Sequence, residues 1–142
     1  KILGDLHSSD KLWNIAILRY FNPVGAHVSG MIGESPNIKP NNLFPIVSET
    51  AAEKRSFVEI YGNDYPTIDG TGVRDYIHIM DLVRGRLSAL NMFSQKGCIF
   101  SVNLGTGTGY SVLEIVNILD YLILMNISIC KTIPILIFFS IQ

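Results

Sequence analysis

Residues 70–81, GTGVRDYIHIMD, bring a turn, a charged cluster and the start of a helix into one short stretch. The two glycines allow positive φ angles or the close approach of a ligand. From 73 to 78 the side chains alternate between two faces, which is the period of a short strand. Arg74 therefore shares a face with Tyr76 and His78, and we expect a functional site here first.

Arg74 has two interpretations that these residues leave open. An arginine beside an aromatic ring at a turn suits a phosphate, because its planar guanidinium can donate two parallel charge-assisted hydrogen bonds. Alternatively, the guanidinium pairs with Asp69, Asp75 or Asp81 and only holds the turn together. Ion pairs are common and phosphate sites are few, so the residues alone favour the ion pair.

The composition is that of one globular domain. The chain has 142 residues, of which 48% are hydrophobic and 16% charged, enough for a core of its own. Its net charge is -1 and its eleven Lys and Arg are scattered, so we expect no nucleic-acid partner. Cys98 and Cys130 have neither metal-ligand spacing nor the number for a disulfide framework, which predicts a reducing compartment, the cytosol.

The N-terminal region predicts a strand that ends at a site. Residues 1–11 are expected to be the end of a helix in a chain that begins as a fragment. Residues 13–21 then read as a strand, whose consecutive apolar residues indicate a parallel sheet buried on both faces. In such sheets ligands bind beyond the carboxyl ends of the strands, which is where Tyr20, Phe21 and Asn22 fall. The alternative is two core aromatics followed by a turn residue.

The middle of the chain predicts alternating loops and elements. Residues 25–42 form a long glycine- and proline-rich loop, a candidate lid. The expected elements that follow are a helix over 43–54 capped by Asn42, a strand over 57–61, a helix capped by Asp81 that runs to about 93, and a strand over 99–104.

The glycine-rich residues 105–110, GTGTGY, follow a strand and precede a helix. Their spacing is G-x-G-x-G rather than G-x-G-x-x-G, and no acidic strand end follows about 20 residues on, so we do not assign a dinucleotide loop. Ser111 and Glu114 instead form a capping box that predicts a helix from 112 to about 119.

Residues 118–142 are almost entirely apolar. A membrane span is disfavoured because Asn126, Lys131 and Pro134 interrupt the run. A buried β segment over 133–141 is a second interpretation. We favour a third, in which this tail is not the native continuation of the domain, because the run lacks the period of a helix or strand facing a core. The expected division is therefore 1–117 and 118–142.

Five motifs together are specific: LRYFNPVGAH at 18–27, PNNL at 40–43, YGNDY at 61–65, GTGVRDYIH at 70–78 and NLGTG at 103–107. In this order they closely resemble the UDP-glucose 4-epimerases, extended short-chain dehydrogenases. The resemblance covers about 1–117. It implies an α/β fold: the late strands of a Rossmann-type parallel sheet plus much of a small substrate domain. It also implies NAD as cofactor, UDP-glucose and UDP-galactose as substrates, and a homodimer for the full-length family member.

The resemblance also implies residue roles. Tyr20 would face the nicotinamide of NAD and border the substrate, Phe21 would face the sugar, and Asn22 would hydrogen-bond the diphosphate. Arg74 would bind a phosphate, which reverses the preference given above. Further substrate contacts are implied for Asn41, Asn42 and Leu43 along the UDP, and for Glu59, Ile60 and Tyr61 around the uracil and ribose.

The departures from the family pattern concern catalysis. The family's glycine-rich NAD loop and its Tyr-x-x-x-Lys pair belong before residue 1, and the family's last substrate contacts are replaced after 117. We therefore expect no catalytic residue in this chain and no activity from it as given. The alternatives are a sister enzyme acting on UDP-glucuronate or UDP-arabinose, and a fragment that is inert or only binds UDP-sugars.

Overall fold

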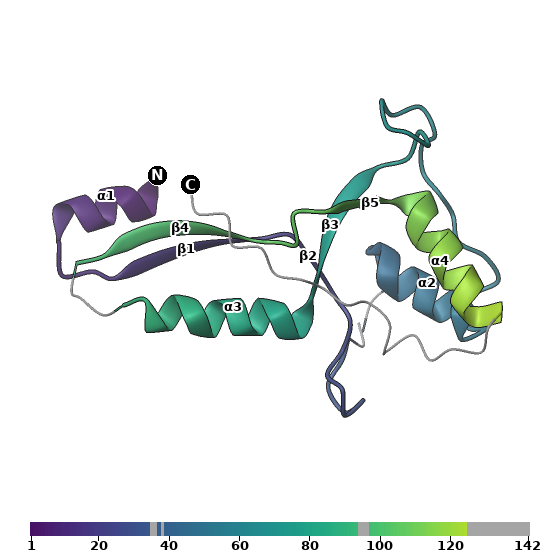
Figure 1. Ribbon diagram of the computed structural model, residues 1–142, viewed down its shortest axis with the longest axis horizontal. Coiled ribbons are helices and arrows are strands. Elements are labelled where there is room, and N and C mark those ends of the chain that lie inside the picture. The colour runs from purple at the N-terminus through teal and green to yellow at the C-terminus, as the bar shows by residue number, and fades with distance from the viewer. Residues whose placement is uncertain (35–36, 38, 94–96, 125–142) are drawn as a thin grey trace.

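The computed structural model, drawn in Figure 1, describes residues 1–34, 37, 39–93 and 97–124. Side chains are described as far as Tyr121. Its helices are α1 (Ile2–Ser9), α2 (Leu43–Ala51), α3 (Ile79–Asn91) and α4 (Val112–Leu124). Its strands are β1 (Ile15–Tyr20), β2 (Asn22–Val24), β3 (Val73–His78), β4 (Ile99–Leu104) and β5 (Gly109–Ser111).

Strands β1 and β4 form a parallel pair, as the apolar run in β1 predicts. The predicted burial on both faces is wrong for the described residues, because within β1 only Ile15 is buried and Arg19 and Tyr20 are exposed. The register runs from Ile15 opposite Ile99 to Tyr20 opposite Leu104, so both strands end at the same place. Helix α3 lies alongside the pair (Figure 1). A Cβ on Gly85 would lie 3.0 Å from Leu104 Cδ2, so the helix backbone approaches β4 closely.

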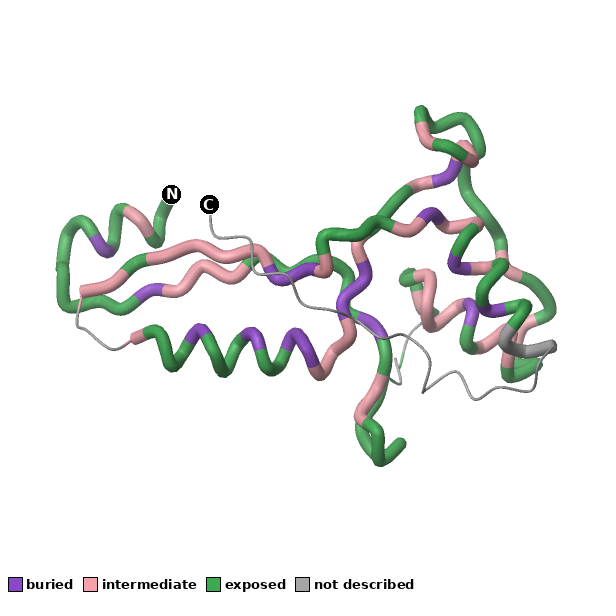
Figure 2. The backbone as a smooth tube through the Cα atoms, in the orientation of Figure 1, coloured by how far each residue is buried: buried purple, intermediate pink, exposed green. Residues whose placement is uncertain are grey.

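Strand β3 is the centre of the second sheet and faces two cores. It pairs parallel with β2 and antiparallel with β5. The first core, the Ile77 core, consists of the buried residues Ile77, Leu82 and Leu104. The second, the Tyr76 core, consists of the buried residues Val24, Val47, Tyr76, Ile115 and Leu119, where helices α2 and α4 meet. Figure 2 shows buried residues on β3 and on the helices to both sides of it. Because successive strand residues point to opposite faces, β3 joins the two cores.

The predicted strand over 57–61 is wrong. These residues have no regular structure, and Phe57 and Tyr61 are 60% and 81% exposed. Only Val58 packs against the Tyr76 core. Their residue types favour strands, but among the described residues no strand lies beside them to accept and donate backbone hydrogen bonds. The three-residue strands β2 and β5 were in turn not predicted.

The start of α3 differs from the prediction, whereas the start of α2 agrees with it. Helix α3 begins at Ile79, and His78 is its cap, with Nδ1 accepting from Met80 N at 3.2 Å. The predicted cap Asp81 is wrong because the cap lies three residues earlier, at His78. Asp81 lies in the first turn and pairs with Arg84 at 2.8 Å. Asn42 is at the cap of α2 as predicted, although its side chain makes no capping hydrogen bond.

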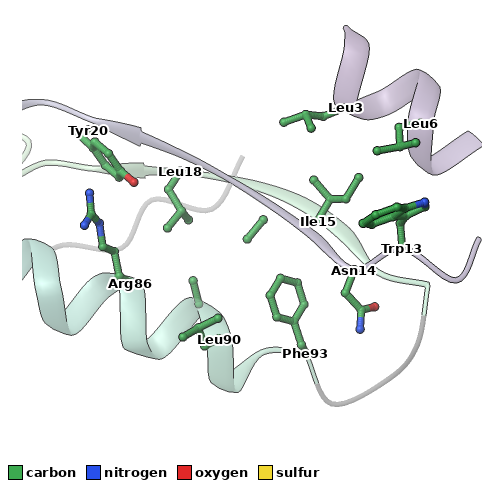
Figure 3. Close-up of a pocket in the computed structure, with 12 residues that line it drawn as sticks. Leu3, Leu6, Trp13, Asn14, Ile15, Leu18, Tyr20, Arg86, Leu90 and Phe93 are labelled. Atoms are coloured by element: carbon green, nitrogen blue, oxygen red, sulfur yellow. The ribbon is translucent and has the colours of Figure 1, made fainter.

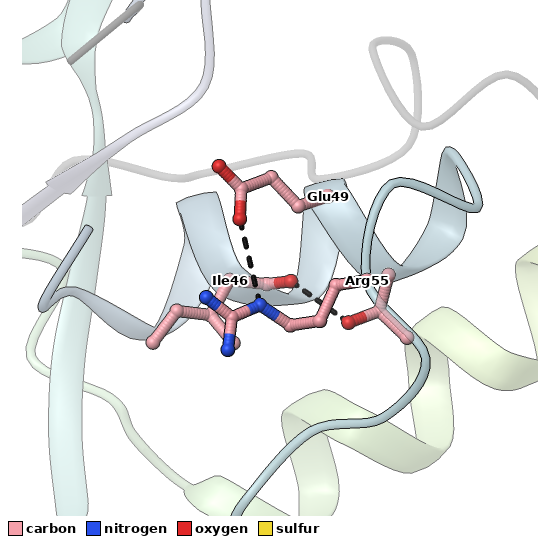
Figure 4. Close-up of polar contacts among 4 residues, drawn as sticks. Ile46, Glu49 and Arg55 are labelled. Atoms are coloured by element: carbon pink, nitrogen blue, oxygen red, sulfur yellow. Dashed lines mark hydrogen bonds and ion pairs between the residues drawn. The ribbon is translucent and has the colours of Figure 1, made fainter. Parts of the chain in front are cut away.

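The end of α2 comes at Ala51, three residues earlier than predicted. There Thr50 Oγ1 donates to Ile46 O at 3.0 Å, and Arg55 Nε lies 3.5 Å from Glu49 Oε2 (Figure 4). The chain therefore leaves the helix folded back against its last turn.

The capping box at α4 is confirmed. Ser111 Oγ accepts from Glu114 N at 3.0 Å, and Glu114 Oε2 accepts from Ser111 N at 2.7 Å. The helix continues to Leu124, five residues beyond the predicted end, and the buried Leu119 belongs to the Tyr76 core. The division at 117 remains a prediction, and residues 125–142 of the apolar tail lie outside the described residues. Within the described part of the chain, no helix combines the length and apolar character needed to cross a membrane.

Candidate functional site

The three consecutive residues predicted to line a site lie where β1 passes into β2. Tyr20 is the last residue of β1 and is 47% exposed. The Arg86 guanidinium of α3 lies over its ring, 4.6 Å from the centroid (Figure 3). Asn22 begins β2 and stands opposite Tyr76 of β3. Tyr20 therefore ends a parallel strand and Phe21 and Asn22 follow it, so the predicted place of these residues at the carboxyl end of the strand is confirmed.

Below Tyr20, a groove of about 660 Å³ runs along β1 between α1 and α3 (Figure 3). Its wall is mostly apolar, and Figure 3 shows side chains from both helices directed toward β1. Trp13, Ile15, Leu18, Leu90 and Phe93 are among its lining residues. The apolar character of the groove suits packing rather than the binding of a charged sugar nucleotide.

Phe21 is held between β4 and the glycine-rich loop that follows β4. Its N–H donates to Leu104 O at 3.0 Å. A Cβ built on Gly105 would lie 1.8 Å from Phe21 Cδ2 and 2.7 Å from Asp75 Oδ2. Only a residue without a side chain therefore fits between the ring and the carboxylate.

Arg74 on β3 is exposed, and its Nη1 donates to the carbonyl of Val73 at 2.9 Å. The three acids that were candidate partners are bonded elsewhere. Asp69 accepts from Thr71 and Ser111, Asp75 accepts from Thr106 and Gly107, and Asp81 pairs with Arg84. Within the described residues, Arg74 forms no ion pair. No bond therefore supports the interpretation in which the guanidinium of Arg74 holds the turn together.

Asp69 instead holds the turn before β3. Its Oδ1 accepts from Thr71 N at 2.9 Å and from Thr71 Oγ1 at 2.7 Å, and its Oδ2 accepts from Ser111 Oγ. These hydrogen bonds, that of Ser111 first, lower the pKa of the Asp69 carboxyl. Gly70 within the turn has φ +77°, the left-handed region that glycine tolerates. The turn thus fixes the backbone just before Arg74.

The other predicted substrate residues lie on separate segments. Asn41 and Asn42 are exposed before α2, and Leu43 packs against the Tyr76 core. Glu59, Ile60 and Tyr61 are exposed in the segment without regular structure. There Tyr61 Oη donates to Glu59 Oε2 at 2.5 Å, and this hydrogen bond, with the charge of Glu59, raises the pKa of Tyr61.

The structure thus brings together only part of the predicted set. Residues 20–22 are consecutive, and Asn22 pairs with Tyr76 of β3, the strand that carries Arg74. Across the described residues, no hydrogen bond or ion pair joins 41–43 or 59–61 to that group. Two neighbours of the set were not predicted from the sequence. Arg86 carries no local signal for its contact with Tyr20, and the partners of Asp75 lie more than thirty residues away along the chain.

The structure has a parallel strand pair, a helix packed alongside it and a glycine-rich turn at the carboxyl ends of the strands. These features define part of a Rossmann-type α/β protein. The chain belongs to the NAD dependent epimerase/dehydratase family, whose profile matches residues 3–105.

Individual proteins that resemble the chain can be named within this family. The chain is 59% identical over 120 residues to a UDP-glucose 4-epimerase of Dictyostelium discoideum, covering 83% of this chain and 35% of that protein. It is 57% identical over 116 residues to one of Bacillus subtilis, covering 82% and 34%. The crystal structure of UDP-glucose 4-epimerase from Bifidobacterium longum in complex with NAD+ and UDP matches with a TM-score of 0.78 and 52% identity, over 82% of this chain and 34% of that one. The resemblance to this family is confirmed, and the chain spans about a third of the length of these relatives.

Proposed function

We propose that the chain carries the substrate-binding part of an NAD-dependent UDP-glucose 4-epimerase, which interconverts UDP-glucose and UDP-galactose. The sugar would be oxidised at C4, the keto-sugar would turn over, and hydride would return to its other face. The observation that carries the proposal is Arg74, an exposed guanidinium on β3 whose three neighbouring acids are already bonded to other groups. Identities above 50% to UDP-glucose 4-epimerases support the choice of substrate.

In this proposal the side chains divide the substrate among them. Arg74 and Asn22 bind the diphosphate, since a guanidinium and an amide N–H both donate to phosphate oxygens. Phe21, which is 43% exposed, contacts the sugar through its ring. Further contacts with UDP come from Asn41, Asn42, Leu43, Glu59, Ile60 and Tyr61.

NAD, when bound, supplies the acceptor for the C4 hydride. Tyr20 would contact the nicotinamide. The Arg86 guanidinium lies over its ring, and the residue is 47% exposed, so part of its surface is free for this contact. A glycine-rich loop with the spacing G-x-G-x-x-G would hold the pyrophosphate of NAD, and these 142 residues contain no such loop.

The 142 residues also contain no tyrosine four positions before a lysine, so the base for the C4 hydroxyl is absent from them. We propose that these residues alone do not catalyse the reaction, and that the complete enzyme is a cytosolic homodimer without nucleic-acid or membrane partners.

The experiment that tests the proposal is a titration of the chain with UDP and with uridine, followed by calorimetry or NMR. Arg74→Ala should weaken UDP binding by about 1.5 to 3 kcal/mol and leave uridine unaffected, because uridine has no phosphate. Arg74→Lys should recover only part of the loss, since lysine cannot make the paired hydrogen bonds.

Arg84→Ala is the matched control, because Arg84 is an exposed arginine that pairs with Asp81 on α3. It should leave both affinities unchanged. Equal UDP affinity in the chain and in both Arg74 variants would remove Arg74 from the site. A coupled assay with NAD should show no conversion of UDP-galactose above a blank, and clear turnover would mean that a catalytic base lies elsewhere in these residues.

A further inference from the structure

The carboxylate of Asp75 holds the loop that follows β4. It accepts hydrogen bonds from Thr106 N at 3.0 and 2.9 Å, from Thr106 Oγ1 at 2.8 Å and from Gly107 N at 2.8 Å. The two backbone donors lie 31 and 32 residues further along the chain. One side chain of β3 therefore satisfies successive backbone N–H groups of a turn that pairs with no strand among the described residues.

The same loop forms a wall beside Phe21. Gly105, the residue before the bonded Thr106, lies directly against the Phe21 ring, since a Cβ there would overlap Cδ2 and Cε2 at 1.8 and 2.4 Å. The Phe21 side chain is not enclosed on all sides, since the residue is 43% exposed. A shift of the loop would therefore free the ring to rotate.

We propose that Asp75 is a positioning residue of the sugar site: through residues 105–107 its carboxylate fixes the ring of Phe21 without touching the substrate. This inference rests on the proposed function, in which Phe21 faces the sugar. It assigns Asp75 a role separate from that of its neighbour Arg74, whose contact is with the diphosphate.

Asp75→Asn is the sharpest variant. An asparagine keeps the shape of the side chain but replaces one acceptor oxygen with an NH₂ donor, which would face the N–H groups of the loop. At least one loop donor then lacks its acceptor. The matched control is Asp69→Asn, which makes the same change at the turn before β3, where the partners are Thr71 and Ser111 rather than the loop beside Phe21.

The readout is the ratio of the affinities for UDP-galactose and UDP, measured with the chain and both variants. In Asp75→Asn this ratio should fall about fivefold or more while UDP affinity stays within about twofold, because only the sugar contact is loosened. Asp69→Asn should lower thermal stability and leave the ratio unchanged. If Asp75→Asn weakens both ligands equally, or neither, Asp75 has a purely structural role and the inference is wrong.

A second readout needs no ligand. The NMR signals of the Phe21 ring, assigned with Phe21→Leu, should move in Asp75→Asn and stay in place in Asp69→Asn. If the unmodified chain binds neither UDP nor UDP-galactose, the proposed function is wrong. If the Phe21 signals do not move in Asp75→Asn, the inference that Asp75 fixes the Phe21 ring is wrong, whatever the ligand binding shows. If Asp75→Asn does not fold, Thr106→Val is judged by the same two readouts. This variant removes the 2.8 Å hydroxyl contact with Asp75, together with the 3.2 Å contacts of the same hydroxyl with Thr108 O and N, and keeps the backbone donors of the loop.

Discussion

Two regions of the proposed substrate site are built in opposite ways. The junction, which we define as β3 with the preceding Asp69–Thr71 turn and residues 104–114, is tied by side-chain hydrogen bonds across 31 to 42 residues of sequence. Its Ile77 and Thr71 are 2% and 1% exposed. The open segment, residues 57–68, has large side chains in solvent, including Tyr61 and a fully exposed Ile68. Its Tyr61–Glu59 bond joins residues only two apart.

The difference shows where the free energy of folding is concentrated. Regions with buried apolar side chains and long-range hydrogen bonds open only with the whole domain, whereas exposed segments with local contacts open at little cost. The junction is therefore suited to holding Arg74 and Phe21 in fixed positions. The open segment instead leaves side chains such as Tyr61 exposed, and in the proposed site a nucleoside would pack against them.

The largest expected effect comes from exchanging the same residue type in both regions. Ile77→Ala should lower the free energy of unfolding by about 2 to 5 kcal/mol, because it leaves a cavity in the Ile77 core. Ile68→Ala should change it by less than about 0.5 kcal/mol, since nothing covers that side chain. Urea unfolding of both variants measures the difference. If Ile77→Ala does not fold, Ile77→Val should still cost about 0.5 to 1.5 kcal/mol, and equal effects at 68 and 77 would contradict the comparison.

A smaller effect is expected from a glycine of the junction, compared with a glycine that immediately precedes β3. Gly105→Ala should destabilise the chain by about 1 to 3 kcal/mol, because the added methyl overlaps Phe21 and the Asp75 carboxylate. Gly72→Ala is the matched control, since nothing lies within 4 Å of a Cβ there and its φ is not positive. Its change should stay within about 0.5 kcal/mol. Thermal unfolding compares the two, and a Gly105→Ala variant as stable as Gly72→Ala would show that the ring has room to move.

Much of the junction could be predicted from local sequence. The alternation over 73–78, the Ser111–Glu114 capping box and the strand over 99–104 each depend on neighbours within a few residues, and all three are confirmed. The place of Tyr20, Phe21 and Asn22 follows from the geometry of parallel sheets. Their roles toward NAD and UDP rest on the family resemblance and stay proposals.

The rest could not be predicted because it depends on distant partners. Residues 57–61 have the composition of a strand, and only the arrangement of the other strands decides that they do not pair. Asp75 was considered as a partner for the adjacent Arg74, whereas its actual partners follow another strand. Strands β2 and β5 are too short for a periodicity to appear.

The two regions should also differ in how they respond to acid. The pKa of Asp69 is lowered by its hydrogen bonds, so its contribution to stability is full above the ordinary value of 3.8 and is lost as pH falls through the lower folded value. Asp69→Asn should therefore flatten the decline of stability below about pH 4. Unfolding measured at a series of pH values tests this. Thr71→Val, which removes one of the hydroxyl donors, should shift the Asp69 titration upward, and an unmoved titration would contradict the assigned cause.

The smallest expected effect is at Tyr61 in the open segment. Its pKa is raised above 10.0 by the hydrogen bond to Glu59 and then by the charge of Glu59, because ionised tyrosine would lose the bond and face a carboxylate. Any contribution of this shift to stability is present below the pKa of Tyr61 in the unfolded chain, and it is lost as pH rises through the pKa in the folded chain. Glu59→Gln should return the Tyr61 titration toward 10.0, measured as the absorbance difference between each protein and its Tyr61→Phe variant. Neither change should measurably alter unfolding in urea, since both side chains are exposed. A clear loss of stability in Tyr61→Phe would mean that the open segment is held as firmly as the junction, and an unchanged titration in Glu59→Gln would mean that the 2.5 Å contact does not form in solution.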